Sequence, residues 1–409
     1  MVSLGCRLNL SEGESLRALL PPGDDLVVIN SCAVTAEAVR QTRQAIRRAR
    51  RERPTARLMV TGCAAEVERE MLAAMPEVDG LIANAAKLEP RAYSPSPSGE
   101  GLGWGLSPDS APAGQTPPPA PPLKGSGEHT RAFVAVQNGC DHACTFCVIP
   151  QGRGPSRSRG VAEVVAEIAR HSAAGVKEAV LTGVDLTSWG GDLPGAPRLG
   201  VLVEAILGGV PALPRLRLSS LDGIEIDAQL FALLAGEPRV MPHVHLSLQS
   251  GDAIILKRMK RRHTPSDAID LVAALRARRP EISIGADLIA GFPTEDEAAH
   301  GQNLAIIRAA NVVHGHIFPY SPRANTPAAR MPLVDAPTIK RRAAELRAAV
   351  AEQRQAWLAA HIGQPLAILA ERDGTGHAPD FARVQLPAGT LPGSLVTLSP
   401  SRIIEGTLA

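Results

Sequence analysis

The sequence predicts an α/β protein with a parallel sheet at its centre, a smaller α/β domain before it and a small β-barrel after it. Three observations support this prediction. The chain has 409 residues, which is too long for one ordinary hydrophobic core and suits two or three domains. Short apolar runs alternate with helix-length segments over most of its length. The last part, residues 364–409, instead has β-type runs broken by glycine and proline, as expected for a small β-barrel.

The amino-terminal domain is predicted over residues 1–90. Short apolar runs near Val2, Leu26 and Leu58 are read as strands, and the segments Ser11–Leu20 and Ala36–Arg51 as helices. Residues 91–129 change character and contain proline, glycine and serine with few large apolar residues. We expect this segment to be an extended linker that buries little surface.

The central domain is predicted over residues 130–336 and contains six βα-type repeats. Such repeats form a parallel sheet, which is either open or curled into part of a barrel. The expected strands are Ala132–Gln137, Glu178–Gly183, Arg215–Ser219, His243–Leu248, Ile282–Ile289 and Val312–Pro319. Residues 337–409 are then expected to form one connecting helix, from Thr338 to about His361, followed by the small β-barrel.

Composition and cysteine usage restrict the location and the chemistry. A formal net charge of +2 does not by itself identify a partner. The start of the chain lacks the basic and apolar regions of a secretion signal, and no apolar stretch approaches the ~18 residues that span a bilayer. We therefore expect a cytoplasmic protein with no membrane partner. The six cysteines all lie within the first 147 residues, so metal or redox chemistry is favoured over a disulfide framework.

The strongest local signal is the segment Cys140-Asp-His-Ala-Cys144-Thr-Phe-Cys147, directly after the first strand of the central domain. Three thiolates on one short loop can converge on one inorganic centre. Structural zinc sites usually close with four ligands. Three cysteines on a four-iron cluster leave one iron open, where it can bind a substrate or cofactor. A three-cysteine zinc loop is the alternative.

Three further cysteines share a setting in the amino-terminal domain. Cys6, Cys32 and Cys63 each follow a short apolar run, with helical segments between them. If those runs are parallel strands, all three cysteines lie at their carboxyl ends, on the edge where open α/β sheets bind ligands. We interpret them as ligands of a second cluster with an open iron. The alternative is that they are small buried apolar residues.

These motifs resemble a known family. The C-x3-C-x2-C pattern, with the aromatic Phe146 before its third cysteine, resembles the radical S-adenosylmethionine (SAM) superfamily. The segments Gly5–Asn9, Asn30–Val34 and Thr61–Cys63 resemble the amino-terminal signature of its methylthiotransferases. Segments that resemble the branch acting on threonylcarbamoyladenosine in tRNA are Cys144–Pro150, Arg153–Arg159, Leu246–Gly251, Lys257–Arg262, Asp287–Pro293 and Phe318–Arg323. The match is strong over residues 1–90 and 130–332 and weak over the tail.

The resemblance implies a fold, cofactors and a reaction. The fold would be a cluster domain, a partial (β/α)6 radical SAM barrel and a TRAM-like β-barrel that binds tRNA. The cofactors would be two [4Fe-4S] clusters and SAM, with a flavodoxin or ferredoxin as electron donor. The central cluster would reductively cleave SAM, and the resulting radical would remove hydrogen from carbon 2 of adenosine 37. The amino-terminal cluster would present sulfur, which a second SAM methylates.

Polar residues at strand ends are candidates for binding SAM. Within the barrel interpretation, Gly183 lets the backbone approach the cofactor closely, and polar side chains could bond its amino or ribose groups. The cofactor-binding candidates, with the aromatic residue of the cysteine loop, are Phe146, Gly183, Asp185, Ser219, Gln249 and Asp287.

Arginines provide candidates for substrate binding. Arg153, Arg157 and Arg159 follow the cysteine loop, and we expect at least one of them to bind the threonylcarbamoyl carboxylate in a two-bond fork. A second group on one predicted helix could contact RNA phosphates or form a solvated face. Its members are Arg40, Arg43, Arg47, Arg48, Arg50, Arg51 and Arg53.

Three other functions remain open from the sequence. An isopentenyladenosine tRNA methylthiotransferase would share every cysteine, and the segment Arg153–Arg159 is the main reason to rank it second. A ribosomal-protein methylthiotransferase shares the same architecture. A non-catalytic iron–sulfur or zinc protein that binds RNA is the alternative from another class.

Overall fold

The computed structural model describes residues 1–20, 25–93 and 130–409. The linker predicted over residues 91–129 lies almost entirely outside the described residues. No helix in these three ranges is both long and apolar enough to cross a membrane.

The amino-terminal domain is a parallel sheet with the strand order β1-β2-β3-β4. Its strands are β1 (Val2–Ser3), β2 (Leu26–Ser31), β3 (Arg57–Gly62) and β4 (Gly80–Leu81), and its helices are α1 (Arg7–Leu19), α2 (Ala36–Glu52), α3 (Cys63–Val67) and α4 (Arg69–Ala73). Every residue of β2 is buried, because helices cover both faces of the sheet. Alternate strand residues pack on Ile46 of α2 and on Leu16 of α1.

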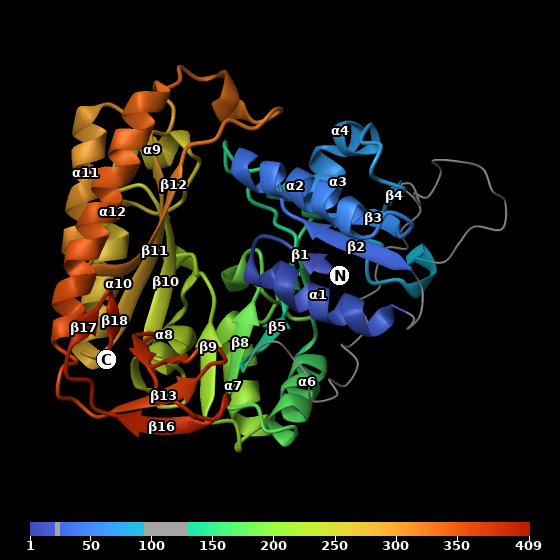
Figure 1. The fold of residues 1–409 in the computed structure, drawn as a ribbon. Coiled ribbons are helices and arrows are strands. Elements are labelled where there is room, and N and C mark those ends of the chain that lie inside the picture. Colours follow the sequence, from blue (N-terminus) through green and yellow to red (C-terminus); the bar gives the residue numbers. More distant parts are fainter. Residues whose placement is uncertain (21–24, 94–129) are drawn as a thin grey trace.

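The central domain is a curved parallel sheet of six strands, with helices on its outer face (Figure 1). Its strands are β5 (Ala132–Ala135), β8 (Glu178–Thr182), β9 (Arg215–Leu218), β10 (His243–Gln249), β11 (Ser283–Ala290) and β12 (Val312–Pro319). Parallel bridges at Leu216 and Leu221 join β9 to the chain at β10, so the two three-stranded sheets continue into each other. The fold predicted from sequence, a partial (β/α)6 barrel, is confirmed.

Helices that connect these strands are α6 (Val161–Ala173), α7 (Leu199–Gly209), α8 (Ala228–Gly236), α9 (Ala253–Arg258), α10 (Pro265–Arg278) and α11 (Glu297–Ala309). All of these helices except α9, which packs in a separate apolar cluster, contribute the outer half of one large apolar core. The long helix α12 (Ala336–Ala359) then crosses β12 at Gly315, where an added Cβ would lie 2.5 Å from Val350. This close approach explains why β12 carries a glycine at that point.

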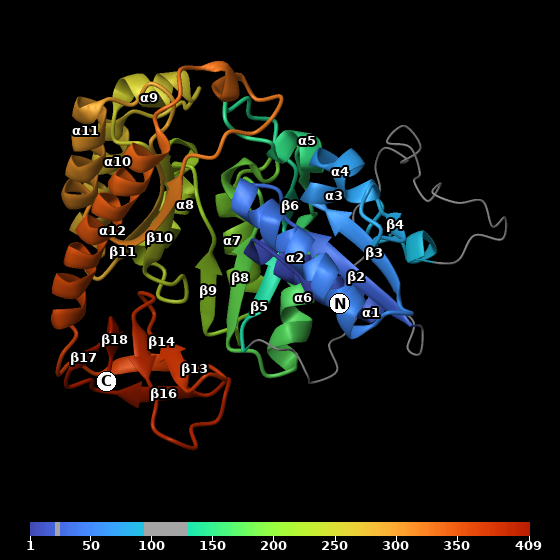
Figure 2. The same ribbon diagram turned by 45° about the horizontal axis from the view of Figure 1, so that its top comes forward.

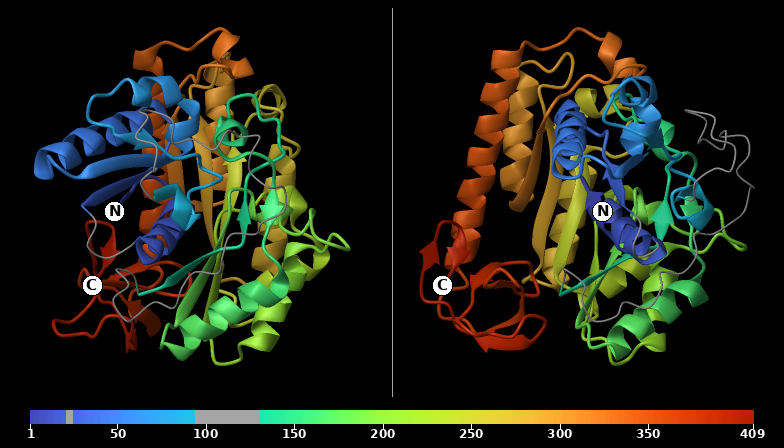
Figure 3. Two further views of the ribbon diagram at one scale, coloured as in Figure 1. Left: turned by 90° about the vertical axis from the view of Figure 1, so that its right-hand side faces the viewer. Right: turned by 45° about the vertical axis from the view of Figure 1, so that its right-hand side comes forward.

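The carboxy-terminal part is a six-stranded, mostly antiparallel sheet at the lower end of the barrel (Figure 2). Its strands are β13 (Leu366–Ala370), β14 (Thr375–His377), β15 (Arg383–Gln385), β16 (Leu395–Leu398), β17 (Ile403–Ile404) and β18 (Thr407–Leu408), in the order β16-β13-β14-β15-β18-β17. The views in Figure 3 show this sheet curled on itself, and its apolar residues share a small core with Leu358 of α12.

Phe381, between β14 and β15, docks this sheet onto the barrel. Its ring stacks on His243 at the start of β10, with ring centres 5.0 Å apart, and on His377, at 4.4 Å. The guanidinium of Arg217 in β9 lies 4.8 Å from the ring centre. Phe381 has a φ of +74°, which is strained for a bulky residue, so these contacts hold the backbone in place.

The amino-terminal domain bridges the first and last barrel strands, as Figures 1 and 3 show. On one side α1 packs along β5. On the other side, the loop after β12 contacts the domain twice. The amide of Ala36 donates to Ser321 Oγ at 3.0 Å, and Arg323 forms an ion pair with Glu68 at 2.5 Å. The interior of the barrel therefore faces this domain.

Candidate active site

The central cysteines lie on a loop whose base is fixed by a two-stranded ribbon. Strands β6 (Gln137–Asn138) and β7 (Arg157–Ser158) pair antiparallel on either side of it. Gly139 has a φ of +74°, and an added Cβ would lie 1.8 Å from the carbonyl oxygen of Pro155, so only glycine fits there. The amide of Cys140 then donates to the carbonyl of Gly154 at 3.1 Å. The loop therefore leaves the ribbon in one fixed direction.

The thiols of this loop suit a cluster better than a single ion. Burial raises the pKa of Cys140 to about 11 and that of Cys147 to about 12, so these thiols ionise only beside a strong positive charge such as a metal centre. One tetrahedral zinc ion would hold its sulfur ligands about 3.8 Å apart. In the described ranges, neither trio of cysteines gathers its sulfurs within 4.8 Å of one another. Because structural zinc sites usually close with four ligands, three thiols on one loop favour a cluster with one open iron.

The amino-terminal cysteines gather at one edge of their sheet. Cys32 and Cys63 directly follow β2 and β3, whose register pairs Ser31 with Gly62. Gly5 lies against Cys32, because an added Cβ there would lie 2.7 Å from Cys32 Sγ. The segment that carries Cys6 is therefore close to Cys32. Burial raises the pKa of Cys32 to about 11, and the neighbouring Cys6 and Cys63 add to the effect. Parallel strands therefore bring three thiols from distant parts of the sequence to one place.

The two cysteine groups are separated by a single short helix. Helix α5 (Ile149–Arg153) begins two residues after Cys147 and packs on α3, which begins with Cys63. An added Cβ on Gly152 would lie 3.2 Å from Cys63 Cβ. The Asn84 side chain fixes α5 by donating to the carbonyl of Gly152 at 2.6 Å. Two metal clusters bound here would be close neighbours.

Arg153 is placed differently from the sequence prediction. It is buried, its Nη1 donates to Glu12 Oε1 at 2.9 Å, and its Nη2 donates to Asn9 Oδ1 at 2.5 Å. These bonds join α5 to α1, so the guanidinium links the central domain to the amino-terminal domain. The prediction that it binds substrate is corrected, because its donors are already occupied by buried acceptors.

Arg159 is also buried, and its guanidinium is bonded to carboxylates of the protein. Its guanidinium donates to Glu163 at 2.8 Å and to Glu167 at 2.6 Å, both on α6. The substrate-binding prediction is corrected for this residue for the same reason. Arg157 is exposed, and its one hydrogen bond in the described ranges is a 3.3 Å contact with the carbonyl of Arg153. Of the three arginines, Arg157 alone keeps its guanidinium accessible to substrate.

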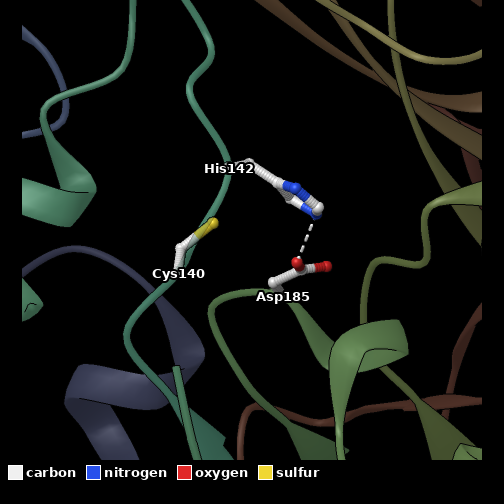
Figure 4. Close-up of side chains that lie close together, drawn as sticks. All are labelled: Cys140, His142 and Asp185. Carbon is white, nitrogen blue, oxygen red and sulfur yellow. Dashed lines mark ion pairs between the residues drawn. The ribbon is translucent and has the colours of Figure 1, made fainter. Parts of the chain in front are cut away.

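Asp185 lies next to the cysteine loop. Its Oδ2 forms an ion pair with His142 Nε2 at 2.7 Å, and Cys140 Sγ lies within 4.8 Å of both groups (Figure 4). The hydrogen bond that His142 donates to the Asp185 carboxylate raises the pKa of His142. Asp185 thus holds the loop that carries Cys140.

Gly183 approaches a protein side chain. An added Cβ there would lie 2.9 Å from Gln137 Oε1, and that same oxygen accepts bonds from the amides of Val184 and Asp185. Gln137 thus fills the space that a side chain at position 183 would take. It also fixes the turn after β8.

Three other cofactor-binding candidates lie near the carboxyl ends of the strands. Ser219 follows β9, and its buried Oγ has no hydrogen-bond partner among the described residues, so it can accept or donate a bond to a ligand. Gln249 ends β10 with a φ of +67°, beside a shift in strand register. Phe146 packs edge-on against Phe292, with ring centres 6.3 Å apart, at the edge of an apolar cluster.

Asp287 lies within β11 and is held by two histidines. Its Oδ1 lies 3.0 Å from His245 Nε2 in β10 and 3.0 Å from His316 Nδ1 in β12. Burial alone would raise the pKa of Asp287, but these hydrogen bonds outweigh burial and hold the pKa well below its usual range. The carboxylate is therefore ionised and already satisfied.

Several site residues are missed by the sequence interpretation. Arg261 Nη1 lies 3.8 Å from Cys144 Sγ, and Arg261 also donates to Asp222 at 2.9 Å, so it supports the loop from the turn between α9 and α10. Gln137 and His142 lie in or beside the cysteine motif, which was the available signal. Glu12, His245 and His316 carry no local signal, because their partners are distant in sequence.

The arginines of α2 are only partly free. Arg40 and Arg48 pair with Glu37 and Glu52 on the same helix. Arg47 pairs with Glu77 at 3.7 Å. Arg43 and Arg51 are exposed, and neither forms an ion pair within the described part of the chain.

The last two arginines of this group are tied to the domain. Arg50 donates to the carbonyls of Ala56 and Glu77, and Arg53 pairs with Asp25. The α2 surface that could contact phosphates is therefore smaller than the sequence suggests.

Comparison with known proteins places these features in a family. Residues 134–301 match the model of the radical SAM superfamily, and residues 1–83 match that of the uncharacterized protein family UPF0004. The radical SAM methyltransferase TsrM from Kitasatospora setae has a similar fold, with a TM-score of 0.55 at 18% identity over 78% of this chain and 66% of that chain.

Curated relatives are similar over almost the whole length. The threonylcarbamoyladenosine tRNA methylthiotransferase MtaB of Rickettsia prowazekii is 43% identical over 94% of this chain and 90% of its own. The enzyme of the same name from Chlamydia pneumoniae is 31% identical over 99% and 96%. The tRNA-2-methylthio-N(6)-dimethylallyladenosine synthase of Paracoccus denitrificans is 31% identical over 90% and 85%. The chain belongs to the radical SAM methylthiotransferases, in the branch of the threonylcarbamoyladenosine tRNA methylthiotransferases.

Proposed function

We propose that this protein attaches a methylthio group to carbon 2 of N6-threonylcarbamoyladenosine at position 37 of tRNA, by radical SAM chemistry. The observation that carries the proposal is the close approach of the two cysteine groups across α5. One group suits SAM cleavage and the other suits sulfur delivery, and Gly152 brings their supports into contact. The 43% identity to a curated enzyme of this activity supports the choice of substrate.

The donor set fits the cofactors of this family. Cys140, Cys144 and Cys147 would hold the SAM-binding [4Fe-4S] cluster, and Cys6, Cys32 and Cys63 would hold the second. When bound, the clusters and SAM supply the electron, the hydrogen-abstracting radical, the sulfur and the methyl group. We assign the unpartnered Oγ of Ser219, the side chain of Gln249 and the ring of Phe146 to contacts with SAM.

The remaining polar residues orient these groups. Asp185 fixes His142 and hence the direction of the cysteine loop, and Gln137 fixes the turn that carries Asp185. Asp287 is held ionised by two histidines, so it can order polar groups in the barrel without changing its own charge. Because α1 and the loop after β12 cover the barrel, they limit the access of water to the reacting base.

The partners follow from the reaction. The substrate is tRNA, and the exposed Arg43, Arg51 and Arg157 are assigned to contacts with its phosphates, together with the carboxy-terminal sheet. A flavodoxin or ferredoxin is proposed as the electron donor, and the cytoplasm as the location. We propose functional units at residues 1–90, 130–336 and 337–409, joined by the linker 91–129.

The cluster assignment is tested with two triple variants. We expect about four irons per cluster in anaerobically reconstituted protein. Replacing Cys140, Cys144 and Cys147 with alanine should halve the iron and abolish SAM cleavage. Replacing Cys6, Cys32 and Cys63 should halve the iron but leave SAM cleavage measurable without methylthiolation. Full iron content in the second variant would show that the amino-terminal cysteines hold no cluster.

The substrate assignment is tested by mass spectrometry of tRNA nucleosides from a deletion strain. Loss of the 2-methylthio form of threonylcarbamoyladenosine, restored by the gene, is expected. Loss of 2-methylthio-isopentenyladenosine instead would favour the second tRNA branch. An unchanged nucleoside profile would favour a ribosomal-protein substrate, or the non-catalytic alternative if reconstituted protein also fails to cleave SAM.

A further inference from the structure

One half-buried guanidinium in the barrel has no bonded anion among the residues that the structure describes. Arg7 is the first residue of α1, directly after Cys6, and is partly buried against the barrel interior. Its guanidinium carbon lies 5.6 Å from the ring centre of Phe381. Within the described ranges it donates no hydrogen bond and forms no ion pair. An enclosed guanidinium with five unused donors is costly, which points to a missing acceptor.

The carboxylates near Arg7 are already engaged by other residues. Glu178 accepts from Arg217 at 2.8 Å and lies 3.7 Å from Arg215. Asp287, the other nearby carboxylate, is bonded to two histidines. Arg131, which also faces this space, pairs with Glu371 at 2.7 Å. Glu178 and Asp287 therefore act on Arg7 only at a distance, and no carboxylate in the described ranges is bonded to it.

Arg217 provides independent evidence for a missing acceptor. Its side chain is 0% exposed, and its Nη1 has no hydrogen-bond partner among the described residues. Arg131 and Arg217 both lie close enough to Arg7 to act on it electrostatically, so the space around Arg7 is rich in cations. Arg7 remains charged at neutral pH and calls for an anionic ligand.

This space is open toward the side where substrate would enter. The side chain of His316 is 58% exposed and that of its partner Asp287 is 18% exposed, so the barrel interior meets solvent beside β12. Gly5 and Cys6, directly before Arg7, are also exposed. A base that reaches the amino-terminal cysteines can thus extend its N6 substituent toward Arg7.

We propose that Arg7 binds the carboxylate of the threonylcarbamoyl group and thereby selects this base over isopentenyladenosine. The inference rests on the proposed function and names a residue that determines its specificity. A guanidinium pairs with a carboxylate through two parallel bonds, whereas an isopentenyl group offers no acceptor. The sequence analysis expected Arg153, Arg157 or Arg159 to bind this carboxylate, and the proposal assigns that role to Arg7 instead.

The test uses an anticodon stem-loop RNA in two forms, one with the natural threonylcarbamoyl carboxylate and one with a carboxamide in its place. The carboxamide keeps the shape and removes the charge. Wild-type enzyme should methylthiolate the carboxamide with a kcat/KM roughly 10- to 100-fold lower, the range expected for a charged hydrogen-bonded pair. Arg7→Gln should lose a similar factor on the carboxylate form and treat the two forms alike. Arg7→Lys should have a kcat/KM on the carboxylate form between that of wild type and that of Arg7→Gln.

Two further variants serve as controls. Arg170→Gln removes an exposed arginine on the outer helix α6 and should keep the wild-type preference. Arg157→Gln tests the rival site near the cysteine loop. If Arg157→Gln abolishes the preference and Arg7→Gln keeps it, the inference is overturned. Iron content is measured in every variant, and loss of half the iron in both Arg7 variants would assign Arg7 to the cluster and overturn the inference.

The wild-type measurements separate this inference from the proposed function. Enzyme that modifies the carboxylate and carboxamide forms equally well overturns the inference alone. Enzyme that modifies only an isopentenylated stem-loop overturns the proposed function, and the inference with it. A preference for the carboxylate that disappears in Arg7→Gln supports both.

Discussion

Glu12 holds two cations at the boundary between the amino-terminal domain and the barrel. Lys87 Nζ lies 2.5 Å from its Oε2, and Arg153 Nη1 lies 2.9 Å from its Oε1. All three side chains are at most 5% exposed. Buried charges are stable only while they remain paired, so loss of one partner costs far more than loss of an exposed ion pair.

Stability should therefore depend on the ionisation of Glu12. Burial alone would raise the pKa of Glu12, but Arg153 and Lys87 outweigh it and lower the pKa from 4.5 to about 2. Because the folded pKa lies below the unfolded value, this carboxylate stabilises the fold above about pH 4.5, by on the order of 3 kcal/mol. The contribution is lost as the pH falls from 4.5 toward 2.

Equilibrium unfolding of wild type and Glu12→Gln measures this effect. At pH 7 the variant should lose about 3–5 kcal/mol of unfolding free energy, and the difference should shrink below pH 4.5. Glu70→Gln, on the exposed surface of α4, should change it by less than about 0.5 kcal/mol. A difference between wild type and Glu12→Gln that stays constant as the pH is lowered would contradict this account.

At the scale of elements, helix α5 sets the distance between the two cysteine groups. Gly152→Val should push α5 away from Cys63, since even a Cβ at this position would lie 3.2 Å from Cys63 Cβ. We expect methylthiolation to fall about 10- to 100-fold, because small displacements between reacting groups are costly. SAM cleavage without methylthiolation should fall much less.

A glycine with free space around it is the matched control. Gly160, before α6, has no atom within 4 Å of an added Cβ, so Gly160→Ala should keep full methylthiolation. If Gly152→Val and Gly160→Ala are equally active, close packing of α5 on Cys63 is not required.

Most elements can be predicted because their signals are local. The six barrel strands follow from short apolar runs and are placed to within two residues of their ends. The helix predicted at Ser11 in fact begins at Arg7. Gly5, with a φ of +94°, turns the chain so early that the helix starts directly after Cys6. A positive φ is a property of the folded turn, so the sequence does not reveal it.

Site residues can be predicted from the sequence where the expected ligands form a motif. They cannot be predicted where the interacting side chains are distant in the sequence. The six cysteines that we propose as cluster ligands are identified from their spacing and their position after strands. Arg153 and Arg7 show the limit. Both lie next to a cysteine segment, but only the fold reveals that Arg153 bonds to Glu12 and that Arg7 is bonded to no carboxylate in the described part of the chain.

For the molecule as a whole, Phe381 couples the carboxy-terminal sheet to the barrel. Phe381→Ala removes the stacking on His243 and His377 and the contact with Arg217. We expect a loss of about 2–3 kcal/mol of unfolding free energy, below the ~3–5 kcal/mol of a fully buried phenylalanine, because the residue is partly exposed. Thermal unfolding and limited proteolysis of the carboxy-terminal segment would measure the loss.

A second substitution separates the ring from the backbone strain. Phe381→Gly removes the ring and also relieves the positive φ, so it should be less destabilising than Phe381→Ala. If Phe381→Ala has wild-type stability and proteolysis, the sheet is held by other contacts.

The partners of Glu12 also determine the order in which the chain can assemble during synthesis. Glu12 and Lys87 both leave the ribosome before any barrel strand, so the amino-terminal domain can neutralise its buried carboxylate early. Arg153 emerges later and adds a second cation to a pair that already exists. The nascent domain can thus fold around Cys6, Cys32 and Cys63, and Arg153 can bond to it before barrel strands β8 to β12 have been synthesised. Cluster assembly on the first three cysteines could then begin while the rest of the chain is still being translated.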